Sequence, residues 1–214
     1  MINKFIPIKE NYRDMSELEP NSILYFIKKL LTLNKSFKIL DYGCGYGGVI
    51  KYLNTLSSNF TYYSIDIDKD AENYCHNLYP NRLLKCKTYD LILLIGVVEL
   101  NNDKENNSIL NYIKRHSNSE TIIIITTDLF SFKNLRTLYY YFISLGKISQ
   151  YYKLKKYYKN NMSNLELRRK LIKNGFEIIK IFPGPLFYPQ SRIKKFTTWL
   201  AHLNSSYGYI IKIK

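Results

Sequence analysis

The sequence predicts a three-layer α/β fold on a mostly parallel sheet of seven strands, or of six if one strand is missing, with an antiparallel last strand. Two observations predict this class. Short apolar runs alternate with amphipathic helical stretches, and the first such run leads through a glycine-rich turn directly into a helix. With 214 residues the chain has the length of one such domain, and we expect a single domain over residues 1–214.

The first structured part of the chain has the pattern of a βαβ unit. After a polar N-terminal stretch, apolar residues at three- and four-residue spacing predict a helix over residues 22–31. A short strand at 36–40 leads into the glycine turn and a second helix. A β-rich strand at 60–65 follows and ends at Asp66. Strands joined in this way lie parallel in the same sheet.

The next segment contains a conflict over the third strand. Residues 68–78 have the pattern of a helix, and residues 82–86 of a small strand. The apolar run at 90–95 suits a central parallel strand, but the few residues between it and the small strand are too few for a parallel crossover. The third strand is therefore either missing or lies near residues 73–77, in place of the predicted helix.

The alternation continues beyond the central strand. An Asn-rich linker at 101–107 precedes a helix with apolar positions at 109–113, and residues 120–125 form the next buried strand. Residues 129–162 break the alternation, with a helical stripe and a Tyr- and Lys-rich stretch. We expect this segment to be a helical cover over the ligand-binding edge of the sheet.

The C-terminal part closes the sheet. A capping box at 163–166 begins a helix, and Gly175 ends it. A strand at 176–182, a basic helix around 193–203 and a strand at 207–213 follow. We expect the last two strands to form an antiparallel pair.

The composition limits the classes of function. No apolar run reaches the roughly 18–20 residues that span a bilayer. The apolar run at the start of the chain is too short for a signal peptide, so we expect a cytoplasmic protein. Three cysteines without C-x-x-C spacing and three scattered histidines argue against a disulfide framework and a metal site. The net charge of +15 would suit nucleic acid or an anionic membrane, but AT-rich coding would give the same composition.

The glycine turn has the features of a nucleotide-binding loop. Gly43, Gly45 and Gly47 form G-x-G-x-G, and Gly48 would equally complete the dinucleotide pattern G-x-G-x-x-G. Glycines allow a ligand to approach the backbone closely, and the helix that follows directs its free N–H groups to the same point. Asp41, two residues before the first glycine, suits a ligand with an ammonium group and would be poorly placed near a pyrophosphate.

With Asp41 included, the turn resembles the first motif, D/E-x-G-x-G-x-G, of class I S-adenosylmethionine-dependent methyltransferases, whose fold is Rossmann-like. Other segments are similar to the same family. They are Ser64-Ile65-Asp66 for its second-strand end, Tyr89-Asp90-Leu91-Ile92 for its fourth strand, Gly96-Val97-Val98-Glu99-Leu100 for the segment after it, and residues 162–176 for a helix-to-strand passage of the small-molecule branch related to quinone-biosynthesis enzymes. The resemblance covers residues 22–182.

The resemblance implies a site for S-adenosylmethionine and its product S-adenosylhomocysteine. Asp41, Gly43 and Gly45 would face the methionine part, Asp66 the ribose, Ile67 the adenine face, and Gly96 with Val97 the region near the sulfonium. Cys44 is included among the cofactor-binding residues, with a small packing residue as the alternative. Asn77 is the candidate for the third-strand residue that contacts adenine, for which the chain offers no better counterpart.

Methyl transfer from a sulfonium is an in-line displacement, so positioning and exclusion of water can supply much of the rate. A general base is needed only when the acceptor is protonated. Glu99, just past the fourth strand, is the candidate catalytic residue, with a solvated carboxylate at a helix start as the alternative. Tyr12, Asp128 and Tyr188 are candidates for the acceptor pocket.

These observations lead to the hypothesis of a methyltransferase acting on a small-molecule or lipid-like acceptor. The fourth strand continues as Ile95-Gly96-Val97-Val98 and lacks the Asn/Asp-Pro-Pro-Tyr of enzymes that methylate splayed bases, which weakens a nucleic-acid acceptor without excluding it. Basic residues at 151–159 and 192–195 suit phosphate or an anionic bilayer, so peripheral membrane contact stays open. A non-catalytic methyltransferase-like partner subunit and an RNA methyltransferase are the alternatives, and the oligomeric state is not predicted.

Overall fold

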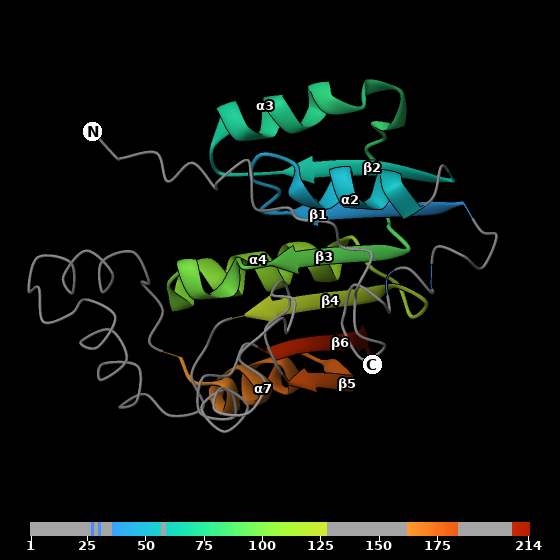
Figure 1. The fold of residues 1–214 in the computed structure, drawn as a ribbon. Helices are drawn as coiled ribbons and strands as arrows, with labels where there is room; N and C mark the ends of the chain where they lie inside the picture. Colours follow the sequence, from blue (N-terminus) through green and yellow to red (C-terminus); the bar gives the residue numbers. More distant parts are fainter. Residues whose placement is uncertain (1–26, 28–29, 31–35, 57–58, 128–161, 184–206) are drawn as a thin grey trace, which may run out of the picture.

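The computed structural model describes residues 27, 30, 36–56, 59–127, 162–183 and 207–214 (Figure 1). Within them, six strands form one sheet in the order β2-β1-β3-β4-β6-β5. The strands are β1 (Phe37–Tyr42), β2 (Phe60–Ile65), β3 (Leu91–Ile95), β4 (Ile122–Thr127), β5 (Phe176–Pro183) and β6 (Tyr207–Ile213). Only β6 runs antiparallel to its neighbours β4 and β5. The predicted α/β fold with an antiparallel last strand is confirmed, in its six-stranded form.

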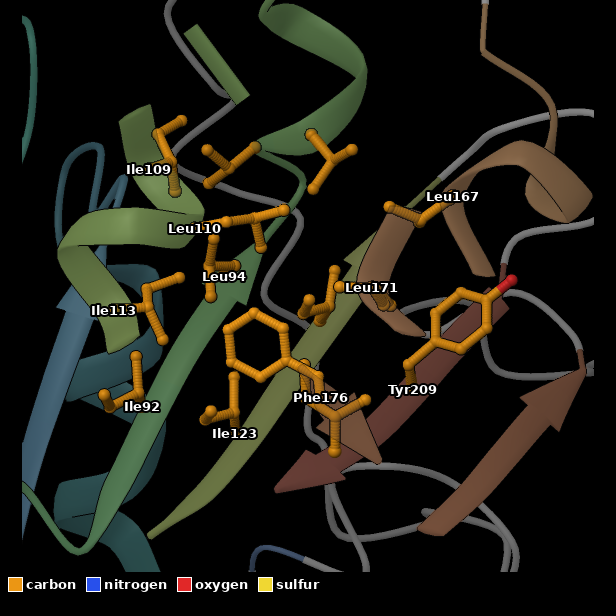
Figure 2. Packing of buried hydrophobic residues seen from close by; sticks show 14 of the residues in the cluster. Ile92, Leu94, Ile109, Leu110, Ile113, Ile123, Leu167, Leu171, Phe176 and Tyr209 are labelled. Carbon is orange, nitrogen blue, oxygen red and sulfur yellow. The ribbon is translucent and has the colours of Figure 1, made fainter. Parts of the chain in front are cut away.

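Helices cover both faces of this sheet and give the predicted three layers. They are α2 (Gly48–Leu56), α3 (Lys69–Leu78), α4 (Asp103–Arg115) and α7 (Asn164–Lys173), with short 3-10 turns η2 (Pro80–Arg82) and η3 (Val98–Leu100). Buried side chains of α2 and α3 pack on one face, in what we call the α2–α3 cluster. Those of α4 and α7 pack on the other face, in the α4–α7 cluster (Figure 2).

The central strand β3 contributes to both clusters. Leu91 and Leu93 belong to the α2–α3 cluster, whereas Ile92 and Leu94 belong to the α4–α7 cluster. All four side chains are completely buried. Successive side chains of a strand point to opposite faces of the sheet, so a strand covered on both sides has to be apolar at every position. This explains the unbroken apolar run in the sequence.

Two capping boxes set the starts of α4 and α7. Asn102 and Glu105 exchange hydrogen bonds at the start of α4, and Ser163 and Glu166 do so at the start of α7. Each box satisfies N–H groups that have no acceptor within the helix. The capping box at 163–166 is therefore confirmed. The linker predicted at 101–107 is wrong in most of its length, because the Asn102 cap starts α4 within it.

In the described part of the chain, the strand expected between β2 and β3 does not form as a complete strand. Residues 73–77 are helical, so a strand there is wrong. Instead, Leu83 forms a single parallel bridge with Tyr62 of β2, and the N–H of Leu84 donates to the Tyr62 carbonyl at 3.0 Å. The small strand predicted at 82–86 is thus reduced to one bridge at the edge of the sheet. Because residues 82–86 do not form a full strand, the few residues before β3 do not have to form a parallel crossover between two strands, and the conflict is resolved.

The last two strands form the predicted antiparallel pair. β6 lies between β4 and β5, with Ile210 opposite Ile124 and Ile211 opposite Ile178. The hydroxyl of Tyr209 in β6 donates to Oδ1 of Asn164 at 3.0 Å, which ties the strand to the first turn of α7. The C-terminal strand therefore belongs to the core.

Some expectations fall wholly or partly outside the described residues. The helical cover at 129–162 is described only at Met162, and the basic helix at 193–203 is not described, so both stay predictions. In the helix predicted at 22–31, Ile27 is helical and buried in the α2–α3 cluster. Among the described helices, none is long and apolar enough to cross a membrane.

Candidate functional site

Most of the predicted site residues come together at the carboxyl ends of β1, β2 and β3. In Figure 1 the parallel strands of the sheet point the same way, and their ends lie along one edge. Asp41 in β1 is paired with Ser64 in β2 and with Leu93 in β3. The glycine turn follows β1, Asp66 follows β2 and Gly96 follows β3. Ligands of open α/β sheets bind at this edge, so three motifs far apart in the sequence form one candidate site.

Two glycines of the turn have different surroundings. Gly43 has a φ of +84°, and a Cβ placed on it would lie 2.4 Å from Cγ2 of Val97. Gly45 has a φ of +50°, but a Cβ placed on it would meet no described residue within 4 Å. Gly43 is therefore required by close packing against the loop after β3. Gly45 borders open space, and there the backbone is accessible to a ligand.

Asp66 holds the turn from the side of β2. Its Oδ2 accepts a hydrogen bond from the N–H of Gly45 at 2.8 Å, and its Oδ1 accepts one from the N–H of Asp68 at 2.9 Å. The N–H groups of Gly43 and Cys44 both donate to the carbonyl of Ile65, at 2.7 and 3.2 Å. The acid predicted for the ribose and the open glycine are thus in direct contact.

Asp41 is completely buried at the end of β1. Its Oδ2 accepts a hydrogen bond from the hydroxyl of Tyr62 at 2.5 Å, whereas Oδ1 has no hydrogen-bond partner among the described residues. Burial raises the pKa of Asp41 to about 7, because it penalises the ionised form more than the Tyr62 hydrogen bond favours it. A buried carboxyl group with one unused oxygen fits the cationic amino group predicted for the cofactor.

Cys44 points into the core. Its side chain is buried in the α2–α3 cluster beside Cys75. A hydrogen bond to Cys75, together with burial, raises the pKa of Cys44. The side chain therefore has the surroundings of a packing residue, and only its backbone forms part of the turn.

The two residues predicted to contact adenine lie in different places. Ile67 directly follows Asp66 and is 96% exposed, which leaves a large apolar side chain available beside the turn. Asn77 is exposed in the last turn of α3. With a helix rise of about 1.5 Å per residue, it lies about 12 Å along the axis from the end of α3 that follows Asp66. The structure does not bring Asn77 to the site, because the segment is a helix leading away from this edge.

The loop after β3 forms the third side of the site. The N–H of Gly96 donates to Oγ1 of Thr126 at 3.0 Å, which ties the loop to β4. Val97 is buried and packs against Gly43. Glu99 is 4% exposed, and its Oε1 lies 3.6 Å from the position of a Cβ on Gly96. The alternative of a solvated carboxylate is therefore wrong, and Glu99 is a buried acid at the ligand-binding edge.

Sequence reasoning missed Tyr62, which contacts Asp41. Tyr62 and Ser64 lie on the same face of β2, and Ser64 is the register partner of Asp41, but the sequence alone does not specify that register. The candidate acceptor-pocket residues Tyr12, Asp128 and Tyr188 lie outside the described residues. In the ranges that the structure covers, no group of three or more His, Cys, Asp and Glu could hold a metal ion.

Comparison with known families gives a match to most of the chain. A family model described as a methyltransferase domain matches residues 15–181, which include every described residue of the candidate site. A search of curated proteins gave no match.

Solved structures with a similar fold include several methyltransferases. The plantazolicin methyltransferase BamL, in complex with a desmethyl plantazolicin analogue and S-adenosylhomocysteine, is 17% identical, with a TM-score of 0.60 over 89% of this chain and 85% of that chain. The cyclopropane synthase MmaA2 from Mycobacterium tuberculosis is 12% identical, with a TM-score of 0.60 over 88% and 82%. Magnesium protoporphyrin IX methyltransferase from Synechocystis PCC 6803, with bound S-adenosylhomocysteine, is 15% identical, with a TM-score of 0.56 over 89% and 82%. At these identities the likeness concerns the fold.

Proposed function

The chain belongs to the family of methyltransferase domains and uses S-adenosylmethionine, and we propose that its methyl acceptor is a small molecule or a lipid-like metabolite. The family is one of enzymes, which argues against a non-catalytic partner subunit. Bound at the site, the cofactor would supply an electrophilic methyl group. The task of the protein is then to hold both reactants in line and to exclude water.

The cofactor site that we propose uses the residues gathered at the sheet edge. Asp41 would pair with the amino group, Asp66 with the ribose hydroxyls, and Ile67 would pack on the adenine ring. Three observations support this placement: the unused Oδ1 of Asp41, the open space beside Gly45 and the exposed side chain of Ile67. Gly96 and Val97 would border the methyl group.

The observation that carries the acceptor proposal is the loop after β3, which has apolar side chains at Val97 and Val98. Val97 and Val98 are both buried, and the loop has no Asn/Asp-Pro-Pro-Tyr sequence with which to hold a splayed base. The proteins of similar fold include methyltransferases of plantazolicin and of magnesium protoporphyrin IX. Apolar side chains in this loop suit an acceptor that is itself small or lipid-like.

Glu99 is the proposed catalytic residue. Its carboxylate is buried beside Gly96, where the methyl group would lie. A carboxylate in this position would accept the proton of an acceptor hydroxyl, amine or thiol as the new bond to carbon forms. For an acceptor that carries no proton, Glu99 would orient the substrate instead.

The test uses S-adenosylmethionine labelled with tritium in its methyl group. The purified full chain is incubated with a cell extract that is then divided into organic-extractable, small polar, RNA and protein fractions. We expect label in the organic-extractable or small polar fraction, and none with the matched variant Asp66→Ala. Label confined to RNA or protein would overturn the acceptor proposal and favour the RNA methyltransferase alternative or a protein substrate.

We also propose a cytoplasmic enzyme that contacts anionic surfaces through its basic segments. The three cysteines lack C-x-x-C spacing, a pattern that suits a reducing compartment. Residues 128–161 contain seven Lys and Arg but only one acidic residue, so part of the excess charge is concentrated there. Co-sedimentation with vesicles of anionic phospholipid at 0.15 M salt, compared with neutral vesicles, tests this contact.

A further inference from the structure

The two oxygens of the Asp41 carboxyl group have different surroundings. Oδ2 accepts the Tyr62 hydroxyl at 2.5 Å, and Oδ1 has no partner among the described residues. Tyr62 is 2% exposed, and its ring is packed within the α2–α3 cluster. The hydroxyl is therefore held in place by the core and cannot turn to solvent.

We propose that Tyr62 is a positioning residue for the cofactor: it holds Oδ2 of Asp41, so that Oδ1 is the oxygen presented to the cofactor amino group. This inference rests on the cofactor placement proposed above and adds a residue to it. Tyr62 lies in the middle of β2, outside the glycine and acidic motifs, and its hydroxyl donates to Asp41. Its effect on binding passes through Asp41.

The energetic argument follows from burial. A carboxylate removed from water is costly unless donors or a cation surround it, and here one phenol supplies only part of that stabilisation. Burial and the neighbouring Asp41 raise the pKa of Tyr62 well above its usual value, so the phenol stays protonated and remains a donor. The amino group of the cofactor would supply the remaining partner and the opposite charge.

Within the described residues, the other ionisable groups that act on Asp41 supply no positive charge. They are Tyr62 from β2, Cys75 from α3, Cys44 from the turn and Asp66 after β2, whereas the neighbouring position in β3 is Leu93. The thiol of Cys75 lies 3.7 Å from the Tyr62 hydroxyl. A cation bound at Oδ1 would therefore favour the ionised form of Asp41, and cofactor affinity would depend on pH near neutrality.

The experiment is calorimetric titration of S-adenosylhomocysteine into the full chain between pH 6 and pH 8.5. Since burial places the pKa of Asp41 at about 7, we expect the wild-type affinity to rise about tenfold from pH 6 to pH 8. In Tyr62→Phe the carboxylate loses its donor. A pKa higher by about one would weaken binding about fivefold at pH 7, with the two proteins converging by pH 8.5.

Tyr52→Phe is the matched control. Tyr52 is another buried tyrosine of the same cluster, and its hydroxyl has no hydrogen-bond partner among the described residues. Its removal should leave the pH profile of binding unchanged. Cys75→Ala removes the nearest thiol, whose charge also raises the pKa of Asp41, so it should move the profile slightly to lower pH, opposite to the shift expected for Tyr62→Phe.

The outcomes separate the two proposals. A Tyr62→Phe profile that matches wild type, or a loss of equal size at every pH, would overturn the positioning role while leaving the cofactor site intact. A shift in Cys75→Ala without one in Tyr62→Phe would assign the titration to the thiol and overturn it as well. Absence of binding by the wild type would overturn the cofactor site itself, and with it this inference.

Discussion

Alanine substitution at Gly43 should mainly lower stability, whereas at Gly45 it should mainly lower cofactor affinity. Both positions have positive φ, so alanine costs roughly 1–2 kcal/mol at either one. At Gly43 the new Cβ also lies 2.4 Å from Cγ2 of Val97, a buried β-branched side chain with little freedom to move. Overpacking of this kind adds roughly 1–3 kcal/mol, for a total of roughly 2–5 kcal/mol.

At Gly45 the same substitution meets no neighbour within 4 Å in the part of the chain that the structure describes. The loss in the free energy of unfolding should stay near the backbone cost of roughly 1–2 kcal/mol. The new methyl group would occupy the space proposed for the cofactor, so S-adenosylhomocysteine affinity should fall at least tenfold. Gly43→Ala should mainly lower stability, and Gly45→Ala should mainly lower affinity.

Urea unfolding followed by circular dichroism gives the stabilities, and calorimetry gives the affinities. The double variant Gly43→Ala/Val97→Ala serves as the control, because shortening Val97 removes the clashing atom and should restore part of the stability lost by Gly43→Ala. Equal losses of stability at Gly43 and Gly45, or no rescue by Val97→Ala, would refute the packing argument. Unchanged affinity in Gly45→Ala would refute the placement of the cofactor.

Three further predictions concern the acids of the site. Because the pKa of Asp41 is raised from 3.8 to about 7, its contribution to stability is fully present below about pH 4 and is lost as the pH rises to about 7, with a size on the order of 4 kcal/mol. Asp41→Asn should abolish that decline in urea unfolding between pH 4 and pH 7, and an unchanged slope would contradict it. Asp66→Ala removes the acceptor of the Gly45 N–H and the proposed ribose ligand, so S-adenosylhomocysteine binding should fall at least tenfold by calorimetry, whereas undiminished binding would count against the site. Glu99→Gln should lower the rate of methyl transfer at least tenfold with S-adenosylhomocysteine affinity unchanged, and a parallel loss of both would indicate a structural role.

Local patterns in the sequence were sufficient for much of the fold. The glycines after Asp41 predicted the turn, and the apolar run at 90–95 predicted a central strand buried on both faces. Both rest on short-range rules that hold whatever the rest of the chain does. The linker at 101–107 was mispredicted for the same kind of reason, since the Asn102 cap turns an Asn-rich stretch into the start of a helix.

The site was less predictable because its contacts cross from strand to strand. Tyr62 meets Asp41 through the register of β1 and β2, which no local pattern in either strand specifies. The burial of Glu99 likewise depends on how the loop after β3 packs. Asn77 was proposed for an adenine contact that the family makes from its third strand. Here residues 69–78 form the helix α3, and only Leu83 forms a bridge where that strand would lie.

The most direct test of the account is a crystal structure of the chain with S-adenosylhomocysteine. We predict the amino group of the ligand within about 3 Å of Oδ1 of Asp41, and the ribose hydroxyls on the carboxylate of Asp66. The ligand should pass over Gly45, with its adenine ring against Ile67. A ligand bound elsewhere, or one whose amino group leaves Oδ1 of Asp41 without a partner, would contradict the account.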